Sequence, residues 1–559
     1  MLLSMTAALA DGTHTVTITP ATGDTATHSY GAYQIFSGST SGDTVENVTW
    51  GAALNTTTKQ AAFIAALKTL GSSFDGLSST STAAQVAGAI STYASGHDSD
   101  NGKLLAAKIG AFIATEANAI TTTATSSGSF TGLAEGYYFI KDMNNPDDAN
   151  PDNDAYGAST RFILDVVEDL TITAKASVPS VEKKVDDKVD SSNTEDGISW
   201  RDDADYDVGD IVPYKIIGTV SSTIGDYTKY AYEFHDSMSA GLTYFADSTR
   251  VTKVYMFDSK AAADAATDGT GGTDVTTHFT ITGSGQTLDV VANDTNGLKD
   301  ITGVTGSSAF VVYYYAQVND NATMGSTGNA NEVYIEFSNN PNAGGDGEKG
   351  KTPKDTAIVF VYKVVVDKVE KDTNAQDPTA TKPLTGAEFA LFKKYTTANA
   401  TAAGKSAATM PAAGITAAQW ALDDGYIWVA VAGPVKSAVD GIADSRFTFN
   451  HIDDGDYMLV ETQTPAGYNT IDPQKFSVVA NHVNGTLDSL SGNPETGAVI
   501  TMTADKTPGS VSTAVLNNSG ATLPSTGGIG TTLFYVGGGI LVLAAVILLV
   551  TKRRMNAND

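Results

Sequence analysis

The six residues Asp456-Tyr457-Met458-Leu459-Val460-Glu461 decide the fold expected for this chain. Short stretches of aromatic and β-branched side chains that alternate along the chain favour a β-strand. Successive side chains of a strand point to opposite faces, so Tyr457, Leu459 and Glu461 share one face. The two apolar side chains indicate that this face points inward and carries the Glu461 carboxyl group with it. The alternative is an edge strand on which Glu461 meets solvent, and alternation alone leaves both open.

The rest of the chain repeats this kind of pattern. It is rich in Thr, Val, Tyr, Gly and Asn, arranged in many short alternating stretches separated by turns. This composition predicts a mainly β protein built from tandem immunoglobulin-like β-sandwiches. Its 559 residues suffice for about three or four domains. The chain contains no cysteine, so an exported form must stabilise these domains without disulfides.

Charge and motif content exclude several classes of function. The formal net charge is -29, with 63 acidic against 34 basic side chains, which argues against nucleic acid as a partner because phosphate binding needs clustered Lys and Arg. No His-Glu-x-x-His spacing for a metal is present. His235-Asp236-Ser237 is contiguous, whereas the members of a catalytic triad come from distant segments. We therefore expect no enzyme, no cofactor and no metal.

Composition and pattern divide the chain into five parts. They are a partial signal peptide at 1–10, an N-terminal unit at 11–175, a middle unit at 176–357, a C-terminal unit at 358–519 and a tail at 520–559. Ala8-Leu9-Ala10 offers small residues for signal cleavage before Asp11. Helical spacing at 59–70, 83–95 and 104–120 predicts an α+β N-terminal unit with helical insertions. Its loop at 142–157 is rich in Asp and Asn, whose oxygen atoms suit calcium, but the spacing does not match a calcium loop and favours a solvated turn.

The tail combines three features in a fixed order. Residues 533–550 carry no charge and predict a transmembrane helix, and the basic residues 552–554 behind it would stay on the cytoplasmic side. The pentapeptide in front of the helix resembles the wall-sorting signal of Gram-positive surface proteins: Leu523, Pro524, Ser525, Thr526 and Gly527. The resemblance implies that a sortase cuts between Thr526 and Gly527 and passes the Thr acyl group to an amine. The alternative is a plain membrane anchor with a chance pentapeptide.

The C-terminal unit resembles a collagen-adhesin B-type (CnaB, SpaA-like prealbumin) domain of Gram-positive pilins. The segments that carry the resemblance are 367–370, 384–389, 457–462, 465–468 and 515–517. The family forms an intramolecular isopeptide bond, which implies Lys368 as the nucleophile, Asn517 as the acceptor and Glu461 as the acid that promotes the reaction. Lys371 remains an alternative to Lys368, and Asn518 to Asn517. Burial favours this chemistry because it lowers the pKa of a Lys and raises that of a carboxyl group.

The middle unit resembles an A-type (CnaA-like) domain of the same proteins. Residues 179–185 resemble its opening strand, and 235–238 with 241–242 resemble the strand end that carries its acid. Asn331 has the same strand parity as Val333 and Ile335, which points it inward. The resemblance implies a Lys183–Asn331 bond promoted by Asp236, with Lys184 as a serious competitor for Lys183. No corresponding set is evident in the N-terminal unit.

From about residue 11 to its end, the chain resembles a three-domain backbone pilin. The resemblance implies the shaft subunit of a covalently polymerised fimbria, extracellular and attached to the cell wall. Its acceptor for the next subunit would be Lys175, although Thr173-Ala174-Lys175 departs from the Tyr-Pro-Lys-like motif and could be a solvated linker. Expected partners are pilin-class and housekeeping sortases, neighbouring pilin subunits, peptidoglycan, and host or bacterial surface ligands. The alternative is a monomeric wall-anchored adhesin or tip pilin.

Overall fold

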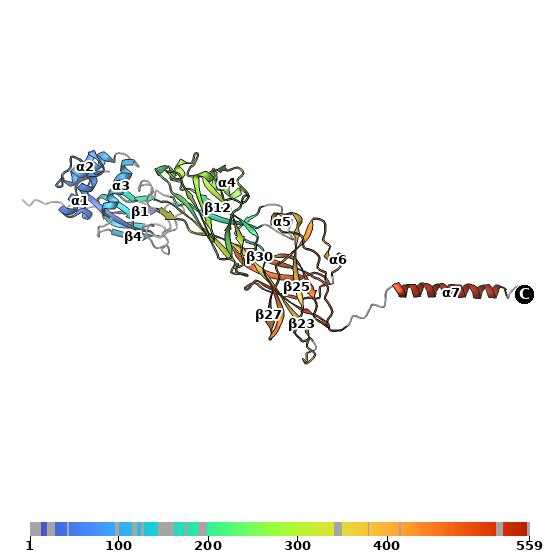
Figure 1. Cartoon of the computed structure of the whole chain (residues 1–559). Coiled ribbons are helices and arrows are strands. Elements are labelled where there is room, and N and C mark those ends of the chain that lie inside the picture. The colour runs from blue at the N-terminus through green and yellow to red at the C-terminus, as the bar shows by residue number, and fades with distance from the viewer. Residues whose placement is uncertain are drawn as a thin grey trace, which may run out of the picture.

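The computed structural model describes most of the chain. The described residues are 13–19, 28–41, 44–94, 100–113, 120–124, 128–143, 161–166, 168–173, 177–187, 198–339, 349–377, 379–412, 415–520 and 529–555. Three β-rich units follow one another in chain order, coloured from blue through green to orange in Figure 1. The predicted mainly β chain of tandem sandwiches is confirmed.

The described residues of the N-terminal unit form two sheets and three α-helices. Its elements are β1 (Thr13–Thr19), β2 (His28–Ser41), β3 (Thr44–Trp50), α1 (Thr57–Lys68), α2 (Ala83–Tyr93), α3 (Asp100–Ile113), β4 (Ile120–Ala124), β5 (Gly128–Ala134), β6 (Gly136–Asp142), β7 (Arg161–Val166) and β8 (Leu170–Thr173). One apolar cluster fills the space between the sheets, and a second joins the helices to β2 and β6. A capping box starts α2, in which Thr82 and Gln85 satisfy each other's backbone N–H groups. The three helices correspond to the three predicted helical segments.

The middle unit is a sandwich of two seven-stranded sheets. Its elements are β9 (Val181–Asp186), β10 (Trp200–Arg201), β11 (Asp203–Asp205), β12 (Ile211–Thr219), β13 (Tyr232–Met238), β14 (Leu242–Phe245), β15 (Lys253–Phe257), α4 (Lys260–Ala265), β16 (Thr273–Asp274), β17 (Phe279–Ser284), β18 (Thr287–Ala292), β19 (Ala309–Val318), β20 (Asn329–Ser338), β21 (Lys349–Lys351) and β22 (Asp355–Phe360). The first sheet contains β9, β12 and β19, and the second contains β13, β20 and β22. Inward side chains of both sheets form one apolar core.

The C-terminal unit is a sandwich of a six-stranded and a five-stranded sheet. Its elements are β23 (Tyr362–Lys371), β24 (Thr381–Pro383), β25 (Glu388–Thr396), α5 (Thr397–Ala402), α6 (Ala417–Trp420), β26 (Tyr426–Ala430), β27 (Val435–Val439), β28 (Ile442–Ile452), β29 (Gly455–Gln463), β30 (Gln474–Val483), β31 (Thr486–Pro494), β32 (Met502–Asp505) and β33 (Ser510–Leu516). Tyr457 and Leu459 of β29 enter the core between the sheets. Met458 and Val460 point to the other face, where Trp428 and Phe392 cover them.

The boundary expected after Ala357 falls inside β22. Residues 358–366 are a nearly continuous run of β-branched and aromatic residues, and the structure divides them between β22 and β23 at Val361. Val359 and Val361 belong to the core of the middle unit, and Phe360 belongs to that of the C-terminal unit. Alternation along one extended segment thus sends neighbouring side chains into two different cores.

The tail contains α7 (Ile529–Met555), which includes the predicted span 533–550. Across the described residues, no helix combines the length and apolar character required to cross a membrane. The transmembrane helix expected from the sequence is therefore not confirmed.

Candidate functional site

The C-terminal unit brings Lys368, Glu461 and Asn517 together, and we call these three residues the C-terminal cluster. Strands β23 and β33 run parallel with Lys368 opposite Val515, so Asn517 follows immediately after the neighbouring strand ends. Glu461 comes from β29 of the facing sheet. All three residues are at most 1% exposed. The alternation in 456–461 therefore points Glu461 inward, whereas the alternatives Lys371 and Asn518 are exposed.

One oxygen of Glu461 contacts both partners of the C-terminal cluster. Asn517 Nδ2 donates a hydrogen bond to Glu461 Oε1 at 2.8 Å, and Lys368 Nζ lies 3.1 Å from the same oxygen. Glu461 Oε2 accepts a bond from the backbone N–H of Ile471 at 3.2 Å, which fixes the carboxyl group. Burial lowers the pKa of Lys368, although the charge of Glu461 opposes this effect. The neutral, nucleophilic form of the amine is therefore more accessible than in water.

The middle unit brings Lys183, Asp236 and Asn331 together, and we call these residues the middle cluster. Lys183 lies on β9 of one sheet, and Asp236 on β13 and Asn331 on β20 lie on the facing sheet. All three residues are at most 3% exposed. The competitor Lys184 points away from the core, with its Nζ 2.6 Å from Asp202 Oδ1.

Burial shifts the pKa values of the middle cluster toward the neutral forms. Lys183 Nζ hydrogen-bonds to Asp236 Oδ2. Burial lowers the pKa of Lys183 and raises that of Asp236, although the opposite charges of this pair resist both shifts. A neutral Lys and a protonated Asp are the forms that an attack of Nζ on the Asn331 carboxamide requires. Asp236 Oδ1 and Asn331 Oδ1 are buried without a hydrogen-bond partner, so a proton on this carboxyl group would supply the missing donor.

The sequence analysis missed Tyr314 of β19. Its side chain is 1% exposed, and its hydroxyl group accepts hydrogen bonds from Lys183 Nζ at 2.6 Å and from Asn331 Nδ2 at 2.8 Å. The same hydroxyl donates to Asp236 Oδ2 at 2.8 Å. The alternation of residues along β19 could have indicated a buried Tyr314, because Tyr314 shares its strand face with the apolar residues Phe310 and Val312.

Several predicted residues lie outside the part of the chain that the structure describes. They are the signal segment 1–10, the acceptor Lys175, the sorting residues 523–527 and residues 144–157 of the Asp-rich loop. In the N-terminal unit, the buried polar residues include His28 and Asp142, with Nδ1 of His28 2.6 Å from Oδ2 of Asp142. This pair joins the ends of β2 and β6 and contains no lysine.

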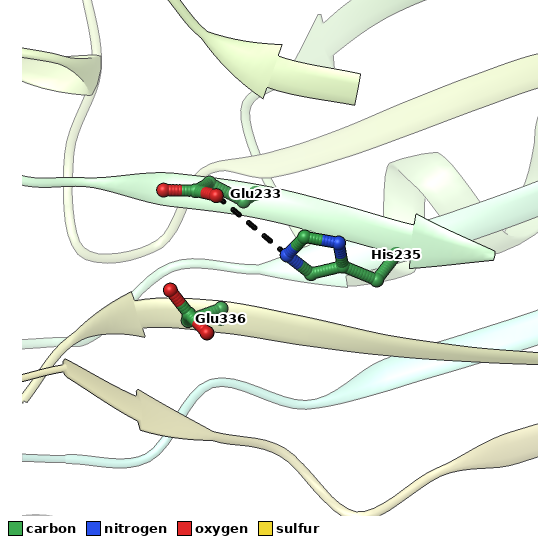
Figure 2. A group of neighbouring side chains, drawn as sticks. All are labelled: Glu233, His235 and Glu336. Carbon is green, nitrogen blue, oxygen red and sulfur yellow. Dashed lines mark ion pairs between the residues drawn. The ribbon is translucent and has the colours of Figure 1, made fainter. Parts of the chain in front are cut away.

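A group of Glu233, His235 and Glu336 lies outside both clusters. Glu233 and His235 lie on β13 and Glu336 on the neighbouring β20, and Figure 2 shows the three side chains close together. One polar atom of each residue lies within 4.8 Å of those of the other two. The ammonium group of Lys349 already occupies the position that a metal ion would take. Its Nζ hydrogen-bonds to Glu233 and lies 3.0 Å from Glu336 Oε1. His235 Nε2 lies 3.6 Å from Glu233 Oε2, and His235 and Lys349 together lower the pKa of Glu233 to about 2. We interpret the group as an ion-pair network on the outer face of the sheet.

Two family models match parts of this chain. A SpaA-type prealbumin-like fold domain matches residues 368–491, which include Lys368 and Glu461. An LPXTG cell wall anchor motif matches residues 516–557, which include the predicted sorting residues. These matches confirm the expected prealbumin-like domain and wall-sorting signal. They indicate a protein of the cell surface that is attached to the cell wall.

One curated relative and two solved structures are similar to the chain. The "Trypsin-resistant surface T6 protein" of Streptococcus pyogenes serotype M6 is 24% identical over 348 residues, which cover 60% of this chain and 51% of that protein. The chain thus aligns with about half the length of this relative. The T6 backbone pilin structure from the same serotype has a TM-score of 0.46 at 14% identity, covering 91% of this chain and 99% of that one. The major pilin SpaD of Corynebacterium diphtheriae has a TM-score of 0.41 at 16% identity, covering 91% and 98%.

Proposed function

We propose that this chain is a shaft subunit of a covalently polymerised fimbria, of the sortase-assembled backbone pilin type found in Gram-positive bacteria. The observation that carries the proposal is the pair of buried Lys–carboxyl–Asn clusters in two consecutive sandwiches of a wall-anchored chain. A charged or polar group is costly to bury unless it is paired, and a repeated buried set of a lysine, a carboxylic acid and an asparagine points to shared chemistry. The prealbumin-like domain and the anchor motif support the same conclusion.

Each cluster is proposed to form one intramolecular isopeptide bond. The Lys amine attacks the Asn carboxamide carbon, the new C–N bond forms, and the Asn nitrogen leaves as ammonia. The carboxyl group polarises the carbonyl and returns a proton to the leaving nitrogen. Holding the groups in contact replaces a bimolecular encounter, which can lower the barrier by about 7–11 kcal/mol. The reaction happens once per cluster, so it is self-modification and not enzymatic turnover.

The subunits are proposed to be joined by sortase chemistry at the two ends of the extracellular part. A pilin-class sortase breaks the Thr526–Gly527 bond, keeps the Thr526 acyl group as a thioester, and transfers it to the amine of Lys175 on the next subunit. A housekeeping sortase transfers the last subunit to peptidoglycan. The uncharged residues 533–550 are proposed to hold the chain in the membrane until this cleavage. Surface ligands of a host or another bacterium are the proposed targets of the assembled fibre.

An electrophoretic ladder tests the proposal. Wall extracts of the producing organism should contain species of increasing mass that resist SDS, because amide bonds join the subunits. The Lys175→Ala variant should leave a monomer, and Lys59→Ala, which removes a partly exposed lysine of the N-terminal unit, should leave the ladder intact. A ladder that survives Lys175→Ala would assign the acceptor to another lysine. A wild-type chain that appears only as a monomer would favour the adhesin.

A further inference from the structure

The two clusters are built differently around their acids. In the C-terminal cluster, Glu461 Oε1 contacts Lys368 and Asn517 directly, and the nearest aromatic face to Lys368 is Phe389, which has no hydroxyl group. In the middle cluster, the acid is Asp236, whose side chain is one methylene shorter. Here Asn331 Nδ2 donates to the Tyr314 hydroxyl, which in turn donates to Asp236 Oδ2. A tyrosine hydroxyl thus stands between the short acid and the acceptor amide.

We propose that Tyr314 is a catalytic residue of isopeptide formation in the middle unit, where its hydroxyl relays a proton between Asp236 and the leaving nitrogen of Asn331. This inference rests on the proposed Lys183–Asn331 bond. Three contacts carry it, because the hydroxyl lies 2.6 Å from the attacking Nζ, 2.8 Å from the leaving Nδ2 and 2.8 Å from the carboxyl Oδ2. These are hydrogen-bond distances to every group that must gain or lose a proton.

The proton and bond changes balance without an external reactant. Lys183 Nζ forms a bond to Cγ of Asn331. The proton already on Asp236 moves to the Tyr314 oxygen as the original Tyr314 proton moves to Nδ2, and the proton that Nζ gives up replaces it on Asp236 Oδ2, with which Nζ is hydrogen-bonded. The Cγ–Nδ2 bond breaks and ammonia leaves, so that Tyr314 and Asp236 end in their starting forms. Burial holds the pKa of Tyr314 well above its ordinary value, so its oxygen keeps a proton to pass on.

A neighbouring tyrosine provides a matched control. Tyr214 lies opposite Tyr314 on β12, and the two rings stack with centroids 5.3 Å apart. Lys183 Nζ is 5.1 Å from the centroid of either ring. The Tyr214 hydroxyl is buried without a hydrogen-bond partner. Tyr214→Phe and Tyr314→Phe therefore remove the same atom from the same packed pair, but only the second removes a hydroxyl group that is hydrogen-bonded to Lys183, Asp236 and Asn331.

The test measures the cross-linked tryptic peptides of the full chain at successive times after synthesis. We expect Tyr314→Phe to slow Lys183–Asn331 formation by about 10²-fold, the lower end for loss of a general acid–base group, while Tyr214→Phe forms the bond as wild type does. The Lys368–Asn517 peptide is the internal reference. Formation at the wild-type rate in Tyr314→Phe would overturn the relay and leave the proposed function intact. A wild-type chain without any Lys183–Asn331 peptide would instead overturn the proposed function.

A second variant separates a relay from a packing role. In Tyr314→Phe/Asp236→Glu, the longer acid beside a phenylalanine imitates the arrangement of Glu461 beside Phe389. We expect the double variant to form the Lys183–Asn331 bond at least tenfold faster than Tyr314→Phe alone. If Tyr314→Phe also impairs folding of the middle unit, this recovery still supports the relay, and its absence counts against it.

Discussion

Two adjacent lysines of β9 differ in burial, and this difference determines which of them can act as a nucleophile. Neighbouring side chains of a strand point to opposite faces, so Lys183 enters the core and Lys184 remains at the surface. Burial lowers the pKa of Lys183, whereas Lys184 forms ion pairs with Glu182 and Asp202. A charged amine is not a nucleophile, so only Lys183 combines proximity to Asn331 with an accessible neutral form.

The first prediction compares these two lysines. Lys183→Ala should abolish the middle bond, and the intact mass of the chain, corrected for the substitution, should exceed that of wild type by one ammonia. Lys184→Ala should keep both bonds, so its measured mass should stay below the mass calculated from its sequence by two ammonia molecules, as in wild type. Intact-mass spectrometry measures both. The same corrected mass for Lys183→Ala and wild type would exclude Lys183 as the nucleophile.

Some residues of the two clusters could be predicted from the sequence, and others could not. Strand parity favoured an inward orientation of Glu461 and Asn331, because their apolar neighbours mark the buried face, but it left open an edge strand with Glu461 in solvent. It did not choose between Lys183 and Lys184, since the apolar residues near them did not fix the register of β9. Tyr314 was missed because its role depends on contacts between the two facing sheets. The alternation of residues within one strand does not predict which side chains of the other sheet they will contact.

The second prediction concerns the acid of the C-terminal cluster. Glu461→Gln keeps the shape of the side chain but removes its acidic proton and its charge, so the Lys368–Asn517 peptide should disappear while the Lys183–Asn331 peptide remains. The variant would also leave the unreacted Lys368 amine buried without a carboxylate partner, which costs about 3–5 kcal/mol of unfolding free energy. Tryptic mass spectrometry and urea unfolding measure the two effects. Glu495→Gln, at an exposed site of the same unit, is the control and should change neither.

At the scale of elements, β11 connects the middle and C-terminal units. Its core-facing residue Ala204 packs in the middle unit, whereas Asp203 Oδ2 accepts a hydrogen bond from the backbone of Gly485 in the C-terminal unit. Just beyond the strand, Asp207 lies 3.3 Å from Lys393 Nζ and 3.1 Å from Lys405 Nζ. These contacts join the two units through charges that are removed from solvent.

The division of residues 358–366 belongs to the same junction. The sequence alone does not mark this division, because both halves are rich in β-branched and aromatic residues. Composition does not record which core each side chain will enter. β22 pairs with the nearby β20 and with β11, which lies much earlier in the chain, and these pairings assign it to the middle unit.

The third prediction concerns Asp210, a buried carboxyl group at this junction, and its effect on stability as the pH changes. Asp210 lies 2.7 Å from Lys405 Nζ, but burial, with a contribution from the charge of Asp207, raises the pKa of Asp210 to about 6. Since the ordinary value is 3.8, the folded chain binds this proton more tightly than the unfolded chain. The resulting stabilisation is complete below about pH 4 and is lost as pH rises through about 6, by at most about 3 kcal/mol.

Asp210→Asn should remove this dependence. Between pH 4 and pH 7.5, the unfolding free energy of the variant should fall less, or rise more, than that of wild type, by up to about 3 kcal/mol. Urea unfolding at both pH values measures the difference, and other carboxyl groups cancel because both proteins share them. Asp226→Asn, at an exposed site of the middle unit, is the control. Parallel pH profiles for wild type and Asp210→Asn would show that the group titrates normally.

At the scale of the whole molecule, the C-terminal cluster lies where it can carry a pulling force. Chain enters this unit through β23 and leaves it after β33, and Lys368 and Asn517 are close to these two points. The two strands are parallel neighbours, so tension along the fibre would otherwise separate them and unfold everything between. A covalent bond from Lys368 to Asn517 would pass the force directly across the unit.

The fourth prediction is therefore mechanical. When one chain is pulled between its ends, Lys368→Ala should release roughly 150 residues of the C-terminal unit, or about 500 Å of extended chain at 3.3–3.6 Å per residue. Wild type should not release this length at forces that leave covalent bonds intact. Single-molecule force spectroscopy resolves such a step, and Lys371→Ala, an exposed position on the same strand, should behave as wild type. Release of the same length by wild type would mean that the C-terminal cluster holds its strands by hydrogen bonds and charge alone.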